Sequence, residues 1–186
     1  MTGQMIGVDE VGRGAWAGPV CVGAVRLLRP VDGLKDSKQL SKAQREKLAW
    51  HIRHSNEVGL GWASAAEVDR LGLTKALGLA MERALRAFEP EAPVLLDGAF
   101  NYLPQRSGIK TMIKADASQA SVSAASIVAK VARDNLMAIM HGRFPAYGFD
   151  KHVGYGTTLH REMIAVLGPC SYHRQSFTPI AQAAMV

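Results

Sequence analysis

The chain has 186 residues, of which 48% are hydrophobic and 20% charged, and its formal net charge is +6. This length and composition are those of an ordinary globular protein with a sizeable core, and the positive excess suits a polyanionic partner such as nucleic acid. The only two cysteines, Cys21 and Cys170, lie far apart without partner spacing, which excludes a disulfide framework or a cysteine zinc site.

Three strands and two helical stretches are expected in the first half of the chain. The strands are expected at 4–8, 19–28 and 57–64. Short links between them favour antiparallel pairing. A helix is expected over Ser41–Ser55 with Ser41 as its N-cap, and a second helical stretch over Ala65–Phe88, which Gly72 divides. Cys21, inside the second apolar run, is expected in the core.

Strands alternate with helices in the second half. Strands are expected at 93–96 and 109–115, and helices at 121–141 and 157–167, the last ended by Gly168-Pro169. This order predicts an α/β fold, in which a mixed central sheet is flanked by helices on both faces. We expect residues 1–186 to form one domain, with a helical C-terminal segment from about 144 packed on the core. The first residues do not show the pattern of a secretory signal, in which basic residues precede an apolar stretch, and no apolar run is long enough to cross a bilayer. We therefore expect a cytoplasmic location.

Acidic side chains follow three of the expected strands. The first strand ends at Asp9-Glu10, the fourth at Asp97 and the fifth at Asp116. Active sites of open α/β sheets lie outside the carboxyl ends of strands, so the four carboxylates are expected on one patch. Crowded carboxylates must gain protons or bind cations, and Mg²⁺ or Mn²⁺ prefers oxygen ligands. The alternative is that Asp9, Glu10 and Asp97 are turn residues and Asp116 opens the next helix.

A glycine-rich loop follows the first acidic pair. Gly12 and Gly14 give the backbone the freedom to bend, and their amides, with the charge of Arg13, could approach a phosphate or sugar closely. The alternative is a charged turn between two strands. Ser37 and Lys38 precede a helix and could hold a phosphate, or form only a capped loop.

Three segments of the second half carry further polar or aromatic residues to interpret. Tyr155, in the loop Gly154–Thr157, could stack on a sugar or base, or pack on its own core. His160 and Arg161 are expected on a solvent-exposed helix face, and Asp134 is expected to pair with Lys130 one helical turn before it.

Seven short motifs follow one another along the chain. They are Gly7–Gly14 (GVDEVGRG) with Ala17–Val20, Asp36–Ser41, Leu96–Gly98, Lys114–Asp116, Ser123–Asp134, Gly154–Thr157 and His173–Phe177. Because these motifs occur in this order, the chain resembles the bacterial ribonuclease HII family (type 2 ribonuclease H). The resemblance extends from Ile6 to about Pro179. Ribonuclease HIII usually has lysine in place of Arg13, together with an added N-terminal domain, so the resemblance favours type HII.

The resemblance implies a ribonuclease H-like fold and a metal-dependent endoribonuclease. Such enzymes cut the RNA strand of RNA–DNA hybrids and the 5′ side of single ribonucleotides in duplex DNA, as in ribonucleotide excision repair, and need no obligate protein partner. The residues that match the family's metal ligands are Asp9, Glu10, Asp97 and Asp116, and those that match its substrate-binding groups are Gly12, Arg13, Gly14, Ser37, Lys38 and Tyr155. Gly12–Gly14 matches the reader of the 2′-hydroxyl and Tyr155 the ring at the ribose–deoxyribose junction.

The mechanism that the resemblance favours uses two divalent ions, Mn²⁺ or Mg²⁺, roughly 4 Å apart and leaves 3′-hydroxyl and 5′-phosphate ends. Ala15-Trp16, Ala115 and Val153 depart from the family pattern without loss of an acid, and Val153 removes one possible phosphate contact. Two other functions stay open: a non-catalytic basic nucleic-acid-binding module, and another nuclease on the same fold.

Overall fold

The computed structural model describes residues 5–184, and of Lys38 it describes the backbone alone. None of the helices in this range is long and apolar enough to cross a membrane. The first elements are β1 (Ile6–Val11), β2 (Val20–Arg26), η1 (Ser37–Gln39), α1 (Lys42–Ser55), β3 (Glu57–Ala63), α2 (Ala65–Leu71) and α3 (Leu73–Leu85). The others are β4 (Val94–Asp97), β5 (Ile109–Met112), α4 (Ala115–Ser118), α5 (Ala120–Arg143), η2 (Pro145–Tyr147), α6 (Phe149–His152), α7 (Thr158–Leu167) and α8 (Thr178–Ala183).

The five strands form one mixed sheet in the order β3-β2-β1-β4-β5. β2 pairs antiparallel with β1 and β3, which confirms the expected pairing of the first three strands, whereas β4 is parallel to both β1 and β5. The register opposes Val8 to Leu96, so the next residues, Asp9 and Asp97, are neighbours. The carboxyl ends of β1, β4 and β5 therefore lie at the same edge of the sheet.

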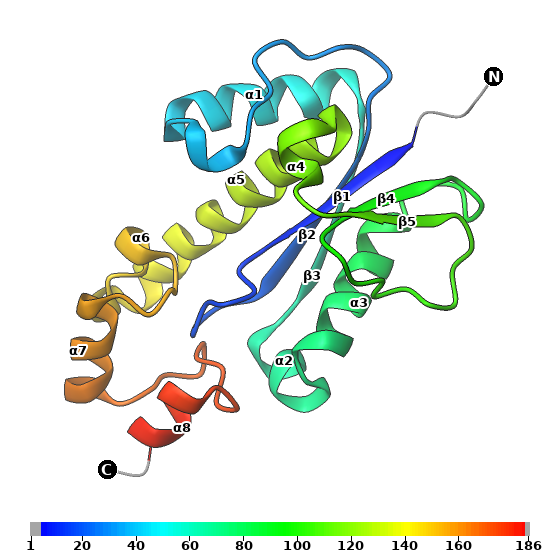
Figure 1. Cartoon of the computed structure of the whole chain (residues 1–186). Helices are drawn as coiled ribbons and strands as arrows, with labels where there is room; N and C mark the ends of the chain where they lie inside the picture. Colours follow the sequence, from blue (N-terminus) through cyan, green and yellow to red (C-terminus); the bar gives the residue numbers. More distant parts are fainter. Residues whose placement is uncertain (1–4, 185–186) are drawn as a thin grey trace.

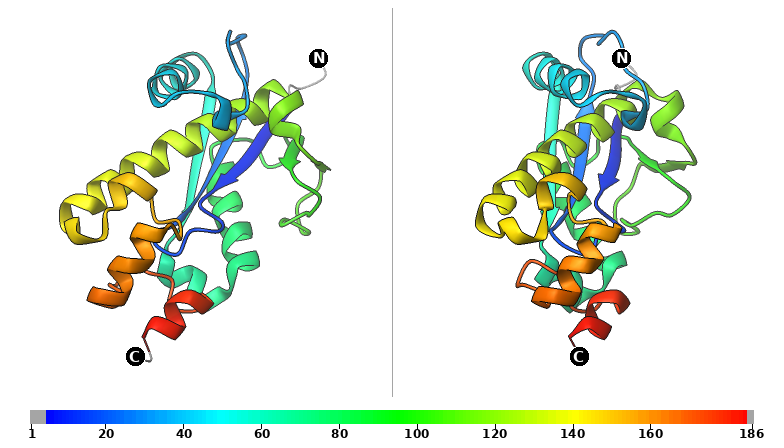
Figure 2. Two further views of the ribbon diagram at one scale, coloured as in Figure 1. Left: turned by 60° about the vertical axis from the view of Figure 1, so that its left-hand side comes forward. Right: turned by 90° about the vertical axis from the view of Figure 1, so that its left-hand side faces the viewer.

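Helices cover both faces of the sheet, as predicted (Figures 1 and 2). α3 packs against one face over a core that includes Val20 and Val22, while α1 and α5 pack against the other over Val25. Gly61 in β3 is required for this packing, because a Cβ there would lie 1.9 Å from the Ala80 carbonyl oxygen of α3. The backbones of β3 and α3 are thus in direct contact at this position.

Several expected boundaries are confirmed and two are wrong. Ser41 caps α1 by accepting from the Gln44 amide, and Gly72 separates α2 from α3. β1 does not end at Asp9-Glu10 but continues to Val11, because its pairing with β2 persists after its pairing with β4 has stopped. β5 ends at Met112 rather than at residue 115, because Lys114 adopts a left-handed φ of 58° and turns the chain into α4.

The segment from residue 144 onward packs on the end of α5 and on the loop after β1. Figure 1 shows α6, α7 and α8 at the end of α5 that is remote from β4 and β5. The apolar contacts come from Ala17, Met137, Met140, Tyr147, Phe149, Ile164 and Ile180. Residues distant in sequence are thereby brought to the glycine-rich loop. That the chain forms a single domain stays a prediction.

Candidate active site

The four predicted acids line one hollow at the carboxyl edge of the parallel strands. Asp9 and Glu10 belong to β1, and Asp97 is the last residue of β4. Asp116 stands after β5 in the first turn of the four-residue helix α4; the long helix that it was alternatively expected to open begins only at Ala120, as α5. The Asp97 Oδ1 accepts a 2.7 Å hydrogen bond from the Ala115 amide, which ties the end of β4 to the helix that carries Asp116.

Two of these carboxylates, Asp9 and Glu10, are costly to keep charged. Burial raises the pKa of Asp9 to about 7; a hydrogen bond with Ser126 opposes this, and the nearby charges of Glu10 and Asp97 add to it. Burial also raises the pKa of Glu10, although the charge of Arg13 opposes the change. Arg13 Nη1 lies 3.7 Å from Glu10 Oε1. A bound cation would offset the cost of placing these charges together.

The donor set suits hard divalent cations, because all four acids offer carboxylate oxygens. No three His, Cys, Asp or Glu side chains within residues 5–184 are already arranged to hold an ion. The hollow thus has the oxygen chemistry of a Mg²⁺ or Mn²⁺ site without a finished coordination cage. Water and a phosphate oxygen are the natural sources of the remaining ligands.

Polar groups from η1, α1 and α5 also line the hollow. Ser37 is buried, and its Oγ lies 3.1 Å from the Oγ of Ser126 on α5. Arg45 on α1 donates to the Ser37 carbonyl oxygen, and Lys130 on α5 also lines the hollow. Sequence reasoning missed Ser126, Arg45 and Lys130 as lining residues; the spacing of Ser126 and Lys130, four residues apart on α5, was the available signal. The Lys38 side chain lies outside the described part of the chain.

Lys130 also takes part in the ion pair that its spacing predicts. Its Nζ lies 2.8 Å from Asp134 Oδ1. Asp134 is thus held one turn further along α5, and it does not line the hollow.

The glycine-rich loop lies at the rim of the hollow, and its shape requires glycine. Gly12 has a φ of +86°, and a Cβ there would lie 2.1 Å from the Nε of Arg133. The Gly12 amide donates to the hydroxyl of Tyr155 at 3.2 Å. Arg13 and Gly14 are exposed. The structure therefore brings the predicted loop and the predicted tyrosine together beside the acids.

Two arginines with no accessible surface hold this loop from beneath. Arg133 on α5 donates to the carbonyl oxygens of Ala17, Pro19 and Val153. Arg174 donates to those of Gly12, Arg13 and Gly18. Burial lowers the pKa of Arg133, and lowers that of Arg174 to about 10. Neither guanidinium forms an ion pair with a carboxylate of residues 5–184, so six backbone carbonyls are their hydrogen-bond partners.

Three buried histidines support the loop that carries Tyr155. The expectation that His160 lies on a solvent-exposed helix face is wrong, because the 170–174 segment covers it and leaves it no accessible surface; Arg161 is exposed as expected. The His160 Nδ1 donates to the Tyr155 carbonyl oxygen at 3.0 Å, so its Nε2 accepts from the Nε2 of His173, also at 3.0 Å. His152 accepts from the Gly154 amide through Nδ1 and donates to the Tyr147 carbonyl oxygen through Nε2.

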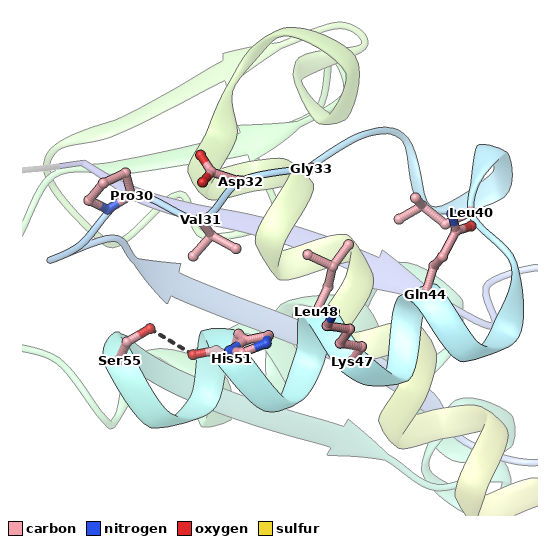
Figure 3. Close-up of a pocket in the computed structure, with 10 residues that line it drawn as sticks. All are labelled: Pro30, Val31, Asp32, Gly33, Leu40, Gln44, Lys47, Leu48, His51 and Ser55. Atoms are coloured by element: carbon pink, nitrogen blue, oxygen red, sulfur yellow. Dashed lines mark hydrogen bonds between the residues drawn. The ribbon is translucent and has the colours of Figure 1, made fainter.

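A second hollow lies between α1 and the loop that follows β2 (Figure 3). Its walls come from Pro30, Val31, Asp32, Gly33, Leu40, Gln44, Lys47, Leu48, His51 and Ser55. It has one acidic residue, Asp32, so it lacks the paired carboxylates of the first hollow. We therefore place the candidate active site at the carboxyl edge of the sheet.

A mixed sheet with four carboxylates gathered at one edge, three from the parallel strands β1 and β4 and one from α4, in a basic chain, is the arrangement of a metal-dependent nuclease with a ribonuclease H-like fold. The family model described as Ribonuclease HII matches residues 6–180. The chain belongs to the ribonuclease HII family, and is thus a metal-dependent endoribonuclease that acts on the RNA strand of RNA–DNA hybrids.

Comparison with individual proteins agrees with this assignment. A ribonuclease HII of Thermus thermophilus is 47% identical over 180 residues, which cover 96% of this chain and 88% of that protein. The ribonuclease HII solved in complex with PCNA from Archaeoglobus fulgidus has a TM-score of 0.79 at 26% identity, with 94% of this chain and 95% of that chain covered. A ribonuclease HIII, Bst-RNase HIII solved with Mn²⁺, shares the fold with a TM-score of 0.74 at 21% identity; all of this chain and 71% of that one are covered.

Proposed function

We propose that this enzyme, besides cutting RNA–DNA hybrids, nicks duplex DNA on the 5′ side of single embedded ribonucleotides and leaves 3′-hydroxyl and 5′-phosphate ends. The observation that carries the proposal is the convergence of Asp9, Glu10, Asp97 and Asp116 on one hollow beside the Gly12–Gly14 loop. Chemistry and recognition of the sugar would then take place within one site. This activity would serve the removal of ribonucleotides from DNA in the cytoplasm.

We propose that the four acids hold two divalent ions, Mn²⁺ or Mg²⁺. Held by these carboxylates, such ions would supply Lewis-acid chemistry, which lowers the pKa of bound water and offsets negative charge on the leaving oxygen. Asp9 contributes a buried carboxylate whose charge a cation would offset, and the Ala115 amide holds Asp97 in place by its hydrogen bond. Manganese bound to a ribonuclease HIII of the same fold supports this choice of metal.

Selection of ribose over deoxyribose requires a group that hydrogen-bonds the 2′-hydroxyl, the atom by which the sugars differ. We assign this role to the backbone of Gly12, Arg13 and Gly14, because this loop borders the acids. A substrate without the hydroxyl would leave polar groups of the loop unpaired, at about 1–3 kcal/mol each.

The remaining substrate contacts are assigned to three side chains. The ring of Tyr155 would pack at the ribose–deoxyribose junction, with its hydroxyl fixed by the Gly12 amide. Ser37 and Lys38 would contact the substrate backbone, Ser37 from the wall of the hollow. RNA–DNA hybrids and ribonucleotide-containing DNA are thus the proposed partners. PCNA is the partner of the Archaeoglobus protein; for this chain we propose no obligate protein partner.

A nicking assay tests the proposal. The protein, with Mg²⁺ or Mn²⁺, is incubated with a DNA duplex that holds one ribonucleotide, with the same duplex in DNA alone, and with a DNA junction. Nicking of the first substrate only, 5′ of the ribonucleotide, is expected. Cleavage of the junction would favour another nuclease on this fold, and binding without cleavage a non-catalytic module. Asp97→Asn should abolish nicking, whereas Asp32→Asn, in the second hollow, should not change it.

A further inference from the structure

Arg174 lies beneath the glycine-rich loop and has no accessible surface. Its Nη2 donates to the Gly12 carbonyl oxygen at 2.7 Å and its Nη1 to that of Arg13 at 2.9 Å. Its Nε reaches the Gly18 carbonyl oxygen at 3.1 Å. The two terminal nitrogens of one planar guanidinium therefore donate hydrogen bonds to two consecutive peptide units of the loop.

The grip on two carbonyl oxygens also orients two amides. In a trans peptide the C=O and the following N–H belong to one rigid plane and point in opposite directions. The Gly12 carbonyl shares its plane with the Arg13 amide, and the Arg13 carbonyl shares its plane with the Gly14 amide. Because Arg174 draws both carbonyls into the protein, both amides face outward, where Arg13 and Gly14 are exposed.

Arg174 is itself held by its neighbours. Its amide donates to the Trp16 carbonyl oxygen at 2.8 Å, and its guanidinium lies 5.1 Å from the centre of the Phe177 ring. The preceding residue, His173, belongs to the histidine cluster that supports the Tyr155 loop. The guanidinium is thus a fixed point and not a mobile side chain that adapts to the loop.

We propose that Arg174 is a positioning residue that determines selection for the 2′-hydroxyl, by holding the carbonyls of Gly12 and Arg13 so that the amides of Arg13 and Gly14 face the substrate. The inference rests on the proposed function of the loop. Arg174 does not line the hollow, so it acts through the peptide units and touches no reacting atom.

Arg133 offers a matched control. It is equally buried and also donates to three carbonyl oxygens, but these belong to Ala17, Pro19 and Val153. Lysine keeps the charge at either position but has one nitrogen, which cannot reproduce the fork of a guanidinium. Arg174→Lys and Arg133→Lys therefore lose comparable buried contacts, while only the first releases the Gly12 and Arg13 carbonyls.

The test compares cleavage of two duplexes that differ at one sugar, a ribonucleotide and its 2′-fluoro counterpart, with enzyme in excess so that slow cleavage is measured. The ratio of the two rates does not depend on the fraction of enzyme that is folded, so loss of stability alone leaves it unchanged. We expect the ratio to fall about tenfold in Arg174→Lys, the equivalent of one lost hydrogen bond. In Arg133→Lys the ratio should fall less, because Arg133 packs against Gly12 and the Tyr155 ring but does not bond the carbonyls of Gly12 or Arg13. Arg174→Gln, which is shorter and neutral, is the second variant if Arg174→Lys does not fold.

The outcomes separate the inference from the proposed function. A wild-type ratio near one would show that the enzyme does not read the hydroxyl, and the proposed role of the loop would fail. A wild-type enzyme that discriminates, with an unchanged ratio in the folded Arg174 variant, would overturn the role of Arg174 alone. Equal falls in the Arg133 and Arg174 variants would also overturn it, because they would point to general loosening of the loop.

Discussion

Acid should destabilise this enzyme through His160. In the folded protein both ring nitrogens of His160 are engaged, Nδ1 as donor to Tyr155 and Nε2 as acceptor from His173. A proton added at Nε2 would face the N–H of His173 instead of a lone pair. Burial lowers the pKa of His160 from 6.5 to about 4, the hydrogen bond to Tyr155 opposes this change, and the neighbouring His152 and His173 add to it.

The sign and size of the effect follow from these pKa values. Above pH 6.5 His160 is neutral in both the folded and unfolded states, and its contribution to stability is complete. Between pH 6.5 and about 4 the unfolded chain binds the proton and the folded one does not, so the free energy of unfolding falls as the pH falls. At about 1.4 kcal/mol per unit of pKa, the loss amounts to about 3 kcal/mol.

Asp9 acts in the opposite direction over part of the same range. Its raised pKa of about 7 means that the folded protein binds a proton before the unfolded one does, which adds stability as the pH falls from about 7 towards 3.8. The informative quantity is therefore the difference between two proteins that share Asp9 and differ at His160.

Urea unfolding of the wild type and of His160→Gln at several pH values between 7 and 4 provides this difference. Glutamine keeps a donor and an acceptor but does not titrate, so the variant should lose about 3 kcal/mol less than the wild type over this range. His51→Asn, at an exposed position of α1, should behave as the wild type. Identical pH slopes for wild type and His160→Gln, or an NMR titration of folded His160 near pH 6.5, would refute the reasoning.

Four further predictions concern the active site and its loops. Asp9→Asn should abolish cleavage in Mg²⁺ or Mn²⁺ while hybrid binding survives in a gel-shift assay; normal cleavage by this variant would contradict the metal-site assignment. Removal of divalent ions with EDTA should stop wild-type cleavage, and added Mn²⁺ should restore it; activity that persists in EDTA would exclude the proposed chemistry. Tyr155→Ala should lose more activity on single embedded ribonucleotides than on long hybrids, and equal losses in the two assays would argue against a junction-reading ring. Gly156→Ala should lower the free energy of unfolding by about 1–3 kcal/mol, because its Cβ would lie 2.2 Å from the Trp16 ring; the double variant with Trp16→Leu should recover most of the loss, and no recovery in thermal unfolding would locate the strain elsewhere.

The meeting of the acids could be predicted in part, because Asp9 and Asp97 follow apolar runs that form neighbouring parallel strands. The local pattern left turn and helix-opening roles open, and the set of four came from the family resemblance; Asp116 reaches the hollow through the left-handed turn at Lys114 and α4. Gly72 and Ser41 were predictable, because helix ends are set by local backbone chemistry.

The supporting residues were not predictable, because their environment comes from segments distant in sequence. Ser126 and Arg45 reach the hollow only once α5 and α1 pack on the sheet. From the sequence, His160 is a polar residue on a short helix. Only the packing of the 170–174 segment over it removes its side chain from solvent. Arg174 is a charged residue in a C-terminal loop, and nothing local indicates that the carbonyls of Gly12 and Arg13 will surround it.

The contact between Arg174 and Gly12 spans 162 positions of the chain, and this has a consequence for biosynthesis. All four acids have left the ribosome well before Arg174 is translated. A nascent chain can therefore gather the acids before the guanidinium that holds the Gly12 and Arg13 carbonyls is available.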